Sequence, residues 1–166
     1  MKIAIISDSH DNIPNIEKFL TWAKVNKIDI IIHCGDIADP ELIKDQLAKK
    51  FTGPIHLVHG NVSNRDLLIE TCDEIDNVTL HGDEGYLKIE NIYIAFCHYP
   101  EVAKDLAKSK KYNFVFYGHT HKPWIEEINQ IVVANPGTLG GVFSKATFAV
   151  LDTKTINLEL KVLETI

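Results

Sequence analysis

The chain has 166 residues, of which 45% are hydrophobic, enough to bury a core in one domain without disulfide or metal staples. Its formal charge of −6 excludes a general attraction for nucleic-acid backbones or anionic lipid, which bind clustered Lys and Arg. Its 3 cysteines are odd in number and form no Cys-x-x-Cys pair, so neither a disulfide framework nor a structural zinc site is expected. A single domain over residues 1–166 is predicted.

The chain begins with a predicted strand at Lys2 to Ile6, which leads directly into the polar run Ser7-Asp8-Ser9-His10. This start lacks the long apolar segment of a signal peptide. Apolar runs such as Ile28 to Ile32 end well before the roughly 18 residues that a membrane span needs. We therefore expect a cytoplasmic protein with no membrane partner.

An amphipathic helix is predicted after the first strand. Apolar side chains recur there at helical spacing, at Ile13, Ile16, Phe19, Leu20 and Ala23. Asn12 is placed to cap this helix, and Pro14 lies in its first turn. Further strands are predicted where short runs are rich in Ile and Val, at Asp29 to His33, Pro54 to Val58, Ile92 to Cys97, Asn113 to Tyr117 and Ile131 to Ala134.

Three more helices and two hairpins complete the predicted elements. The helices open at Asp39-Pro40, at Ser63 as a cap with the helix running through Leu68, and at Pro100 with the helix running through Ala107. The antiparallel hairpins are expected at Leu80 to Ile89 and at Trp124 to Val133. Alternating strands and helices in the first half favour parallel strands, so we predict an α/β (α+β) fold of two mixed sheets with outer helices.

Polar residues with metal-binding side chains follow the predicted strands. They are Asp8, His10, Asp36, Asn61, His98, His119 and His121, each next to the carboxyl end of an apolar run. Because the carboxyl ends of strands line the functional crevice of α/β folds, these residues are expected to converge. Oxygen and nitrogen ligands without thiolates suit Mn²⁺, Zn²⁺, Fe or Ni²⁺.

Seven ligands exceed what one ion needs, and two ions account for them if Asp36 bridges. Asp8, His10 and His121 would then complete one shell. Asn61, His98 and His119 would complete the other. Two such ions can hold a phosphate and lower the pKa of a captured water toward ~7. Each motif alone is better explained by a turn or a helix cap, whereas independent turns have no reason to occur together in this order.

Taken together, Asp8-x-His10, Gly35-Asp36, Gly60-Asn61, His98 and Gly118-His119-x-His121 resemble the motifs of the calcineurin-like metallophosphoesterases. The chain is most similar to the small bacterial and archaeal phosphodiesterase branch. The resemblance implies a four-layer sandwich and a centre of two divalent ions, with Mn²⁺ favoured. It assigns catalysis to Asp36, Asn61 and His98, and implies in-line attack by a bridging hydroxide on the phosphorus of a small phosphoester.

Two departures from the family pattern concern protons. Val62 follows Asn61 where protein-phosphatase-like members carry a His, and Tyr99 follows His98 where small members often read His-Gly-His. The group that would protonate the leaving group is therefore unassigned. Without a strong acid, activated diesters with good leaving groups are favoured.

Weaker candidates surround the motif residues. Substrate binding is a hypothesis for Asn12, Arg65, Asn135 and Gly137, the last two in a glycine-rich loop whose amides could hold an anion. An ordinary turn or a solvent-facing role explains them as well. His33 and His59 lie near motif residues and are candidates for orienting the ligands without binding the ions themselves. His56 and His81 are interpreted as structural or exposed.

Other functions remain open at this stage. A subunit of the retromer sorting coat is similar to this branch and acts by binding partners, so a non-catalytic, metal-binding scaffold is an alternative. A phosphomonoesterase or nucleotidase differs only in substrate. Polymeric nucleic acid is not expected as a partner, and the sequence allows a homo-oligomer.

Overall fold

The Ile- and Val-rich runs form two mixed β-sheets in the computed structural model, which describes residues 1–166. The larger sheet has the order β11-β10-β1-β2-β3-β4. Its strands are β1 (Lys2–Ile6), β2 (Ile30–His33), β3 (Ile55–Leu57), β4 (Val78–Leu80), β10 (Thr147–Asp152) and β11 (Asn157–Val162). Strands β1 to β4 are parallel, as the alternation of strands and helices predicts, and β10 and β11 add antiparallel strands beside β1.

The smaller sheet has the order β5-β6-β7-β9-β8. Its strands are β5 (Glu84–Ile89), β6 (Ile92–Cys97), β7 (Phe114–Phe116), β8 (Trp124–Ile128) and β9 (Ile131–Asn135). The three central strands run parallel, and the two edge strands pair antiparallel through hairpins. The parallel centre of each sheet brings its strand ends to one edge, where the motif loops begin.

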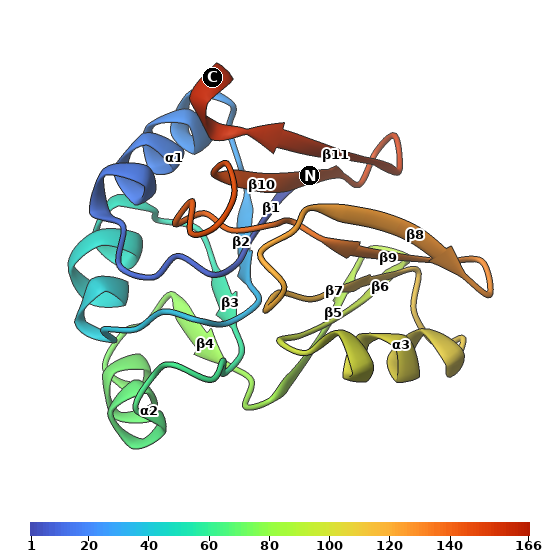
Figure 1. Ribbon diagram of the computed structural model, residues 1–166, viewed down its shortest axis with the longest axis horizontal. Helices are drawn as coiled ribbons and strands as arrows, with labels where there is room; N and C mark the ends of the chain where they lie inside the picture. The colour runs from blue at the N-terminus through green and yellow to red at the C-terminus, as the bar shows by residue number, and fades with distance from the viewer.

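Helices cover the outer face of each sheet, which makes four layers (Figure 1). Helices α1 (Ile13–Val25), η1 (Ile43–Ala48) and α2 (Arg65–Asp73) lie on the larger sheet, and α3 (Pro100–Lys108) lies on the smaller one. The predicted four-layer sandwich is confirmed. None of these helices combines the length and apolar character needed to cross a membrane.

Side chains alternate between the two faces of strand β1, and both faces contribute to the core. Ala4 and Ile6 point to the helices, while Ile3 and Ile5 point to the facing sheet, and all four are fully buried. Burying an Ile side chain in this way contributes about 1.5–3 kcal/mol. The two faces of one strand therefore hold the larger sheet between the helices and the smaller sheet.

Several predicted elements are confirmed by the structure. The Asn12 side chain caps α1 by accepting a hydrogen bond from the Asn15 amide, and α3 begins at Pro100. The hairpin of β8 and β9 turns at Asn129 and Gln130, whose φ angles of 54° and 71° match a type I′ turn. All 3 cysteines are buried free thiols.

Three predictions of elements need correction. The segment after Asp39-Pro40 forms the π-helix η1, and the cap of α2 is Asn64, because the Ser63 hydroxyl bonds to the Ile37 carbonyl instead. The hairpin predicted at Leu80 to Ile89 is wrong: β4 extends the larger sheet, whereas β5 pairs with β6 in the smaller one. Gly85 is needed because the Phe96 ring packs against its Cα, not because the chain turns there.

Candidate metal centre

All seven predicted ligands lie on loops that leave the carboxyl ends of parallel strands. Asp8 and His10 follow β1, Asp36 follows β2, and Asn61 follows β3. His98 follows β6, and His119 and His121 follow β7 in the other sheet. The site therefore forms where the edges of the two sheets meet, and neither sheet supplies it alone.

Four of these residues form the first cluster: the ligand atoms of Asp8, His10, Asp36 and His121 all lie within 4.8 Å of one another. The Nε2 atoms of His10 and His121 are 3.0 Å apart, and His121 Nε2 lies 3.2 Å from Asp8 Oδ1. His121 Nδ1 bonds to the Val142 carbonyl at 3.1 Å, which places its proton on Nδ1 and leaves a lone pair on Nε2. Lone pairs thus converge on one point, as a cation site requires.

The second cluster contains Asn61, His98 and His119. Asn61 Oδ1 lies 3.0 Å from both His98 Nε2 and His119 Nδ1. His98 Nδ1 donates to the Cys34 carbonyl at 2.8 Å, so the neutral form of His98 presents a lone pair on Nε2 to the neighbouring oxygens. This cluster again offers only nitrogen and oxygen ligands.

Asp36 connects the two clusters with its two carboxylate oxygens. Oδ1 lies 3.5 Å from His98 Nε2 in the second cluster, and Oδ2 lies 3.9 Å from His10 Nε2 in the first. The amides of Asn61 and Val62 donate to Oδ1 at 2.7 and 3.2 Å and fix the carboxylate. The residues present fit two divalent cations that share Asp36, since acceptors without matching donors face each other on both sides.

The carboxylates of the site are tuned in opposite directions. Burial raises the pKa of Asp8, because this effect outweighs the lowering by the Ser7 hydroxyl and the nearby imidazoles. Burial also acts on Asp36, but there the His98 hydrogen bond and charge and the two amides lower the pKa to about 2. Burial acts to lower the pKa of His98, and Asp36 outweighs it and raises that pKa. Asp36 is therefore an anion at neutral pH, ready to bridge cations.

The backbone at the ligands is strained. Five of them have positive φ angles, at 51° for Asp8, 42° for His10, 62° for Asp36, 67° for His119 and 56° for His121. Residues other than glycine rarely adopt this conformation, and each instance costs roughly 1–3 kcal/mol. Such strain concentrated on the converging side chains is typical of a functional site.

Two motif glycines allow the close approach of the loops. A Cβ at Gly60 would overlap the Asp36 carboxylate, and a Cβ at Gly118 would overlap the Ser7 hydroxyl and crowd Asp8 Oδ2. Gly60 directly precedes Asn61 and packs against Asp36, which follows a different strand. Gly118 directly precedes His119 and packs against Asp8 and its neighbour Ser7. This explains on steric grounds why the sequence reads Gly-Asn and Gly-His at these points.

Residues behind the ligands hold the loops in place. His33 is fully buried and contacts Ser9 Oγ and the Gly35 amide, each at 3.2 Å, so it braces the two loops as expected. His59 is also buried, and its Nδ1 has no hydrogen-bond partner and touches no ligand. Asp11, which was not predicted, accepts the amides of Ala38 and Asp39, and its place in the polar turn after His10 was the available signal.

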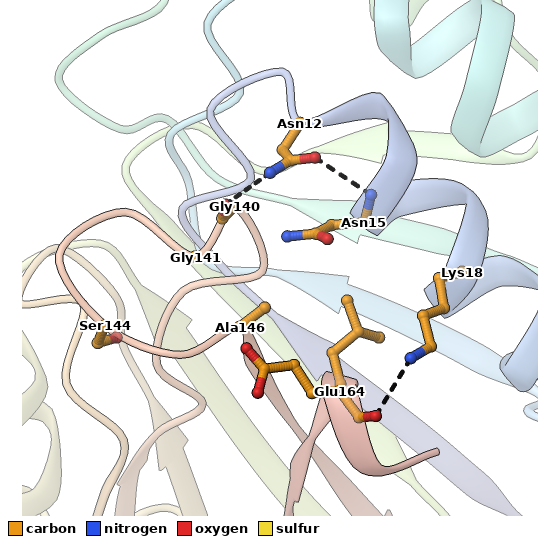
Figure 2. Close-up of a pocket in the computed structure, with 9 residues that line it drawn as sticks. Asn12, Asn15, Lys18, Gly140, Gly141, Ser144, Ala146 and Glu164 are labelled. Atoms are coloured by element: carbon orange, nitrogen blue, oxygen red, sulfur yellow. Dashed lines mark hydrogen bonds between the residues drawn. The ribbon is translucent and has the colours of Figure 1, made fainter.

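Three of the residues proposed to bind substrate have their polar groups occupied within the protein. Asn12 caps α1 through its carbonyl oxygen and donates from Nδ2 to the Gly140 carbonyl at 2.8 Å, as Figure 2 shows. Asn135 is fully buried and donates to Gly118 and Thr120 while accepting from the Gly137 amide. These contacts support the ligand loops, and the contacts of Asn12, Asn135 and Gly137 with substrate stay predictions.

Two further amides of the glycine-rich loop are paired within the protein. Leu139 and Gly140 donate to the carbonyls of Ser7 and Asp8. Arg65, the fourth candidate, lies at the start of α2 and pairs with Asp83 at 2.8 Å, with about half of its side chain exposed. Its role toward a substrate stays a prediction.

Comparison with known proteins agrees with this geometry. The calcineurin-like phosphoesterase superfamily domain matches residues 1–156. A phosphodiesterase of Methanocaldococcus jannaschii is 32% identical over 158 residues, which cover 93% of this chain and 94% of the relative. The solved structure of an archaeal phosphodiesterase is 30% identical, with a TM-score of 0.89 over 98% of this chain and 99% of that one.

A more distant structure shares the fold alone. Vps29 from Entamoeba histolytica, solved in complex with Zn²⁺, is 18% identical with a TM-score of 0.69, over 98% of this chain and 99% of that one. The predicted resemblance to the small phosphodiesterase branch is confirmed. By its motifs, its four layers and these matches, the chain belongs to the calcineurin-like phosphoesterase superfamily.

Proposed function

We propose that this protein hydrolyses phosphodiesters with two divalent metal ions held on either side of Asp36. The observation that carries the proposal is the orientation of the Asp36 carboxylate, which directs one oxygen to each cluster of ligands. When bound, two such ions supply Lewis acidity and lower the pKa of a captured water, which gives a hydroxide for in-line attack on phosphorus.

The residues of the chain position the reacting groups. Asp36 is fixed by two amides, while His98 and His121 are each oriented by a backbone carbonyl bonded to Nδ1. Such outer contacts set which nitrogen faces the ion and keep it there. Asn61 and the imidazoles are neutral ligands, so they hold cations without cancelling the positive charge that attracts a phosphate.

Manganese is the favoured ion, with Zn²⁺, Fe or Ni²⁺ as alternatives, because the ligand set contains only oxygen and nitrogen. The nearby cysteines do not compete for metal. Burial raises the pKa of Cys34 well above its usual value and that of Cys97 to about 12, so both stay as neutral thiols.

The proposed substrates carry good leaving groups. Val62 occupies the position after Asn61, and its side chain can donate no proton to a departing alkoxide. Aryl phosphodiesters should therefore be hydrolysed much faster than dialkyl ones, because an aryloxide leaves without general acid catalysis.

The test is hydrolysis of bis(p-nitrophenyl) phosphate by the manganese-loaded protein, before and after chelation. Asp36→Asn should lower kcat/KM more than ~100-fold while leaving the circular dichroism spectrum unchanged, since loss of even an outer-shell contact costs 10–100-fold. Asp105→Asn is the matched control, because Asp105 is exposed on α3 and pairs only with Lys108. An Asp36→Asn protein that keeps the wild-type rate would refute the proposed mechanism.

The same assay separates the alternatives. Faster hydrolysis of p-nitrophenyl phosphate than of the diester would favour a phosphomonoesterase at the same site. A wild-type protein that binds metal tightly and hydrolyses neither ester would favour the non-catalytic scaffold.

A further inference from the structure

Two exposed aromatic rings lie beside the metal ligands, where no apolar core covers them. Phe143 is 96% exposed and stacks on His121, with ring centroids 5.8 Å apart and an interplanar angle of 30°. Tyr99 is 41% exposed, and its ring packs edge-on against His98 and His119 with centroids 5.0 Å from each. Exposed large apolar groups beside a polar site indicate a ligand that covers them.

The position of Phe143 is fixed by the site itself. The residue before it, Val142, binds His121 Nδ1 through its carbonyl at 3.1 Å, and the residue after it, Ser144, donates to the His121 carbonyl at 2.9 Å. Phe143 has a φ angle of 63°, which is a strained conformation for a bulky residue. The chain thus holds a ring that is almost fully exposed next to a ligand, at a conformational cost, with the His121 ring as its stacking partner.

Tyr99 borders a pocket whose lining includes His98 of the second cluster. The pocket has a volume of about 300 Å³, and its apolar wall includes Cys97, Tyr99 and Val102. His98 lies in the same wall, so the pocket adjoins the second cluster. Apolar walls with one polar end are typical of sites that bind small molecules.

The two rings lie on opposite clusters. Phe143 touches a ligand of the first cluster, and Tyr99 touches two ligands of the second. A phosphodiester with its phosphorus between the clusters extends one organic group from each side of the centre. We propose that Phe143 and Tyr99 are specificity residues that stack against planar aromatic groups, aryl or nucleobase, on the phosphodiester substrate. This inference rests on the proposed function and names the substrate class of that same site.

The charged residues of the pocket narrow the class of substrate further. Two carboxylates, Asp83 and Glu84, line the pocket beside Tyr99, and Arg65 pairs with only one of them. A group that carries a second phosphate would be repelled there, whereas a neutral aryl or nucleoside group would not. The organic group beside Tyr99 is therefore not anionic.

The test uses three diesters that share p-nitrophenolate as leaving group and carry methyl, phenyl or 5′-thymidyl as the other group. All three diesters lose the same leaving group. The kcat/KM of the phenyl or thymidyl ester, divided by the kcat/KM of the methyl ester, therefore measures recognition of the ring. The wild-type protein should prefer the phenyl and thymidyl esters by about fivefold or more, the lower range for stacking of one ring.

Variants assign this preference to the two rings. At least one of Phe143→Leu and Tyr99→Leu should bring the ratio close to one, while Phe143→Tyr and Tyr99→Phe, which keep the ring, should retain it. Ile156→Leu is the control, because Ile156 is also exposed, with a φ angle of 54°, but lies in the turn between β10 and β11.

The outcomes distinguish failure of this inference from failure of the proposed function on which it rests. A wild-type ratio near one, or a ratio that neither Leu variant changes, overturns the assignment of the rings while hydrolysis of the methyl ester still supports the phosphodiesterase. Failure of the wild-type protein to hydrolyse any of the three diesters refutes the proposed function itself, and the inference with it.

Discussion

His33 illustrates how a single buried residue supports the site. Its Nδ1 accepts the Gly35 amide, so the proton lies on Nε2, which donates to Ser9 Oγ. Burial lowers the pKa of His33 from 6.5 to about 3, because a charged imidazole would lose solvation. Protonation would also break the bond to Gly35 and loosen the loop that carries Asp36.

This depressed pKa predicts a specific acid sensitivity. Between pH 6.5 and 3 the unfolded chain binds a proton on His33 that the folded chain does not, so the free energy of unfolding falls as the pH is lowered. One proton corresponds to a slope of about 1.4 kcal/mol per pH unit. Urea unfolding of the metal-free protein from pH 6 to pH 4 should show a slope smaller by that amount in His33→Gln. Equal slopes in the two proteins would contradict the role of His33.

At the scale of elements, β9 and the loop after β7 act as a unit. Asn135 ends β9, and its amide donates to the Gly118 carbonyl at 2.7 Å and the Thr120 hydroxyl at 3.0 Å. These contacts lie on either side of His119 and precede His121. The strand therefore positions one ligand of each cluster.

Removal of this support should weaken metal binding without removing a ligand. Asn135→Ala is expected to lower the affinity for Mn²⁺ about 10–100-fold, as the loss of outer-shell partners does. It should also destabilise the protein by about 1–3 kcal/mol, because two buried groups lose their partner. Titration calorimetry and thermal unfolding measure both effects, with the exposed Asn157→Ala as control. An unchanged affinity would show that the loop does not depend on β9.

A helix or strand can be predicted from the sequence when the residues that determine it lie within its own segment. Helix α1 is predictable because its cap, its proline and its apolar period all lie within the segment. The hairpin at residues 80–89 was misassigned because Gly82 and Gly85 are turn residues by type, whereas Gly85 accommodates Phe96 from another strand. Strands β10 and β11 were not predicted, and the pairing of β10 with β1 joins opposite ends of the chain.

The same distinction between signals within a segment and contacts between distant segments applies to the candidate site. The convergence of the seven predicted ligands could be foreseen, because they follow apolar strands and the fold brings strand ends together. The internal hydrogen bonds of Asn135, and that of Asn12 Nδ2 to the Gly140 carbonyl, could not, since an amide side chain has the same identity whether it faces a substrate or a backbone carbonyl. The same holds for the amides of Leu139 and Gly140, which the structure pairs with the carbonyls of Ser7 and Asp8.

At the scale of the whole molecule, the two sheets are both needed for one centre. The larger sheet supplies Asp8, His10, Asp36 and Asn61, and the smaller one supplies the remaining three imidazoles. The apolar layer between the sheets, which includes Ile5, Ile32 and Phe116, sets how the two edges meet. The geometry at Asp36 is thus a property of the complete sandwich.

The most direct test of this account is the number of metal ions that one chain binds. Elemental analysis of protein saturated with Mn²⁺ and then desalted should give two ions per chain, because Asp36 directs an oxygen to each cluster. Asn61→Ala should retain one ion, and Asp36→Asn should weaken the binding of both. A single ion per saturated wild-type chain would contradict the central claim that Asp36 bridges two cations.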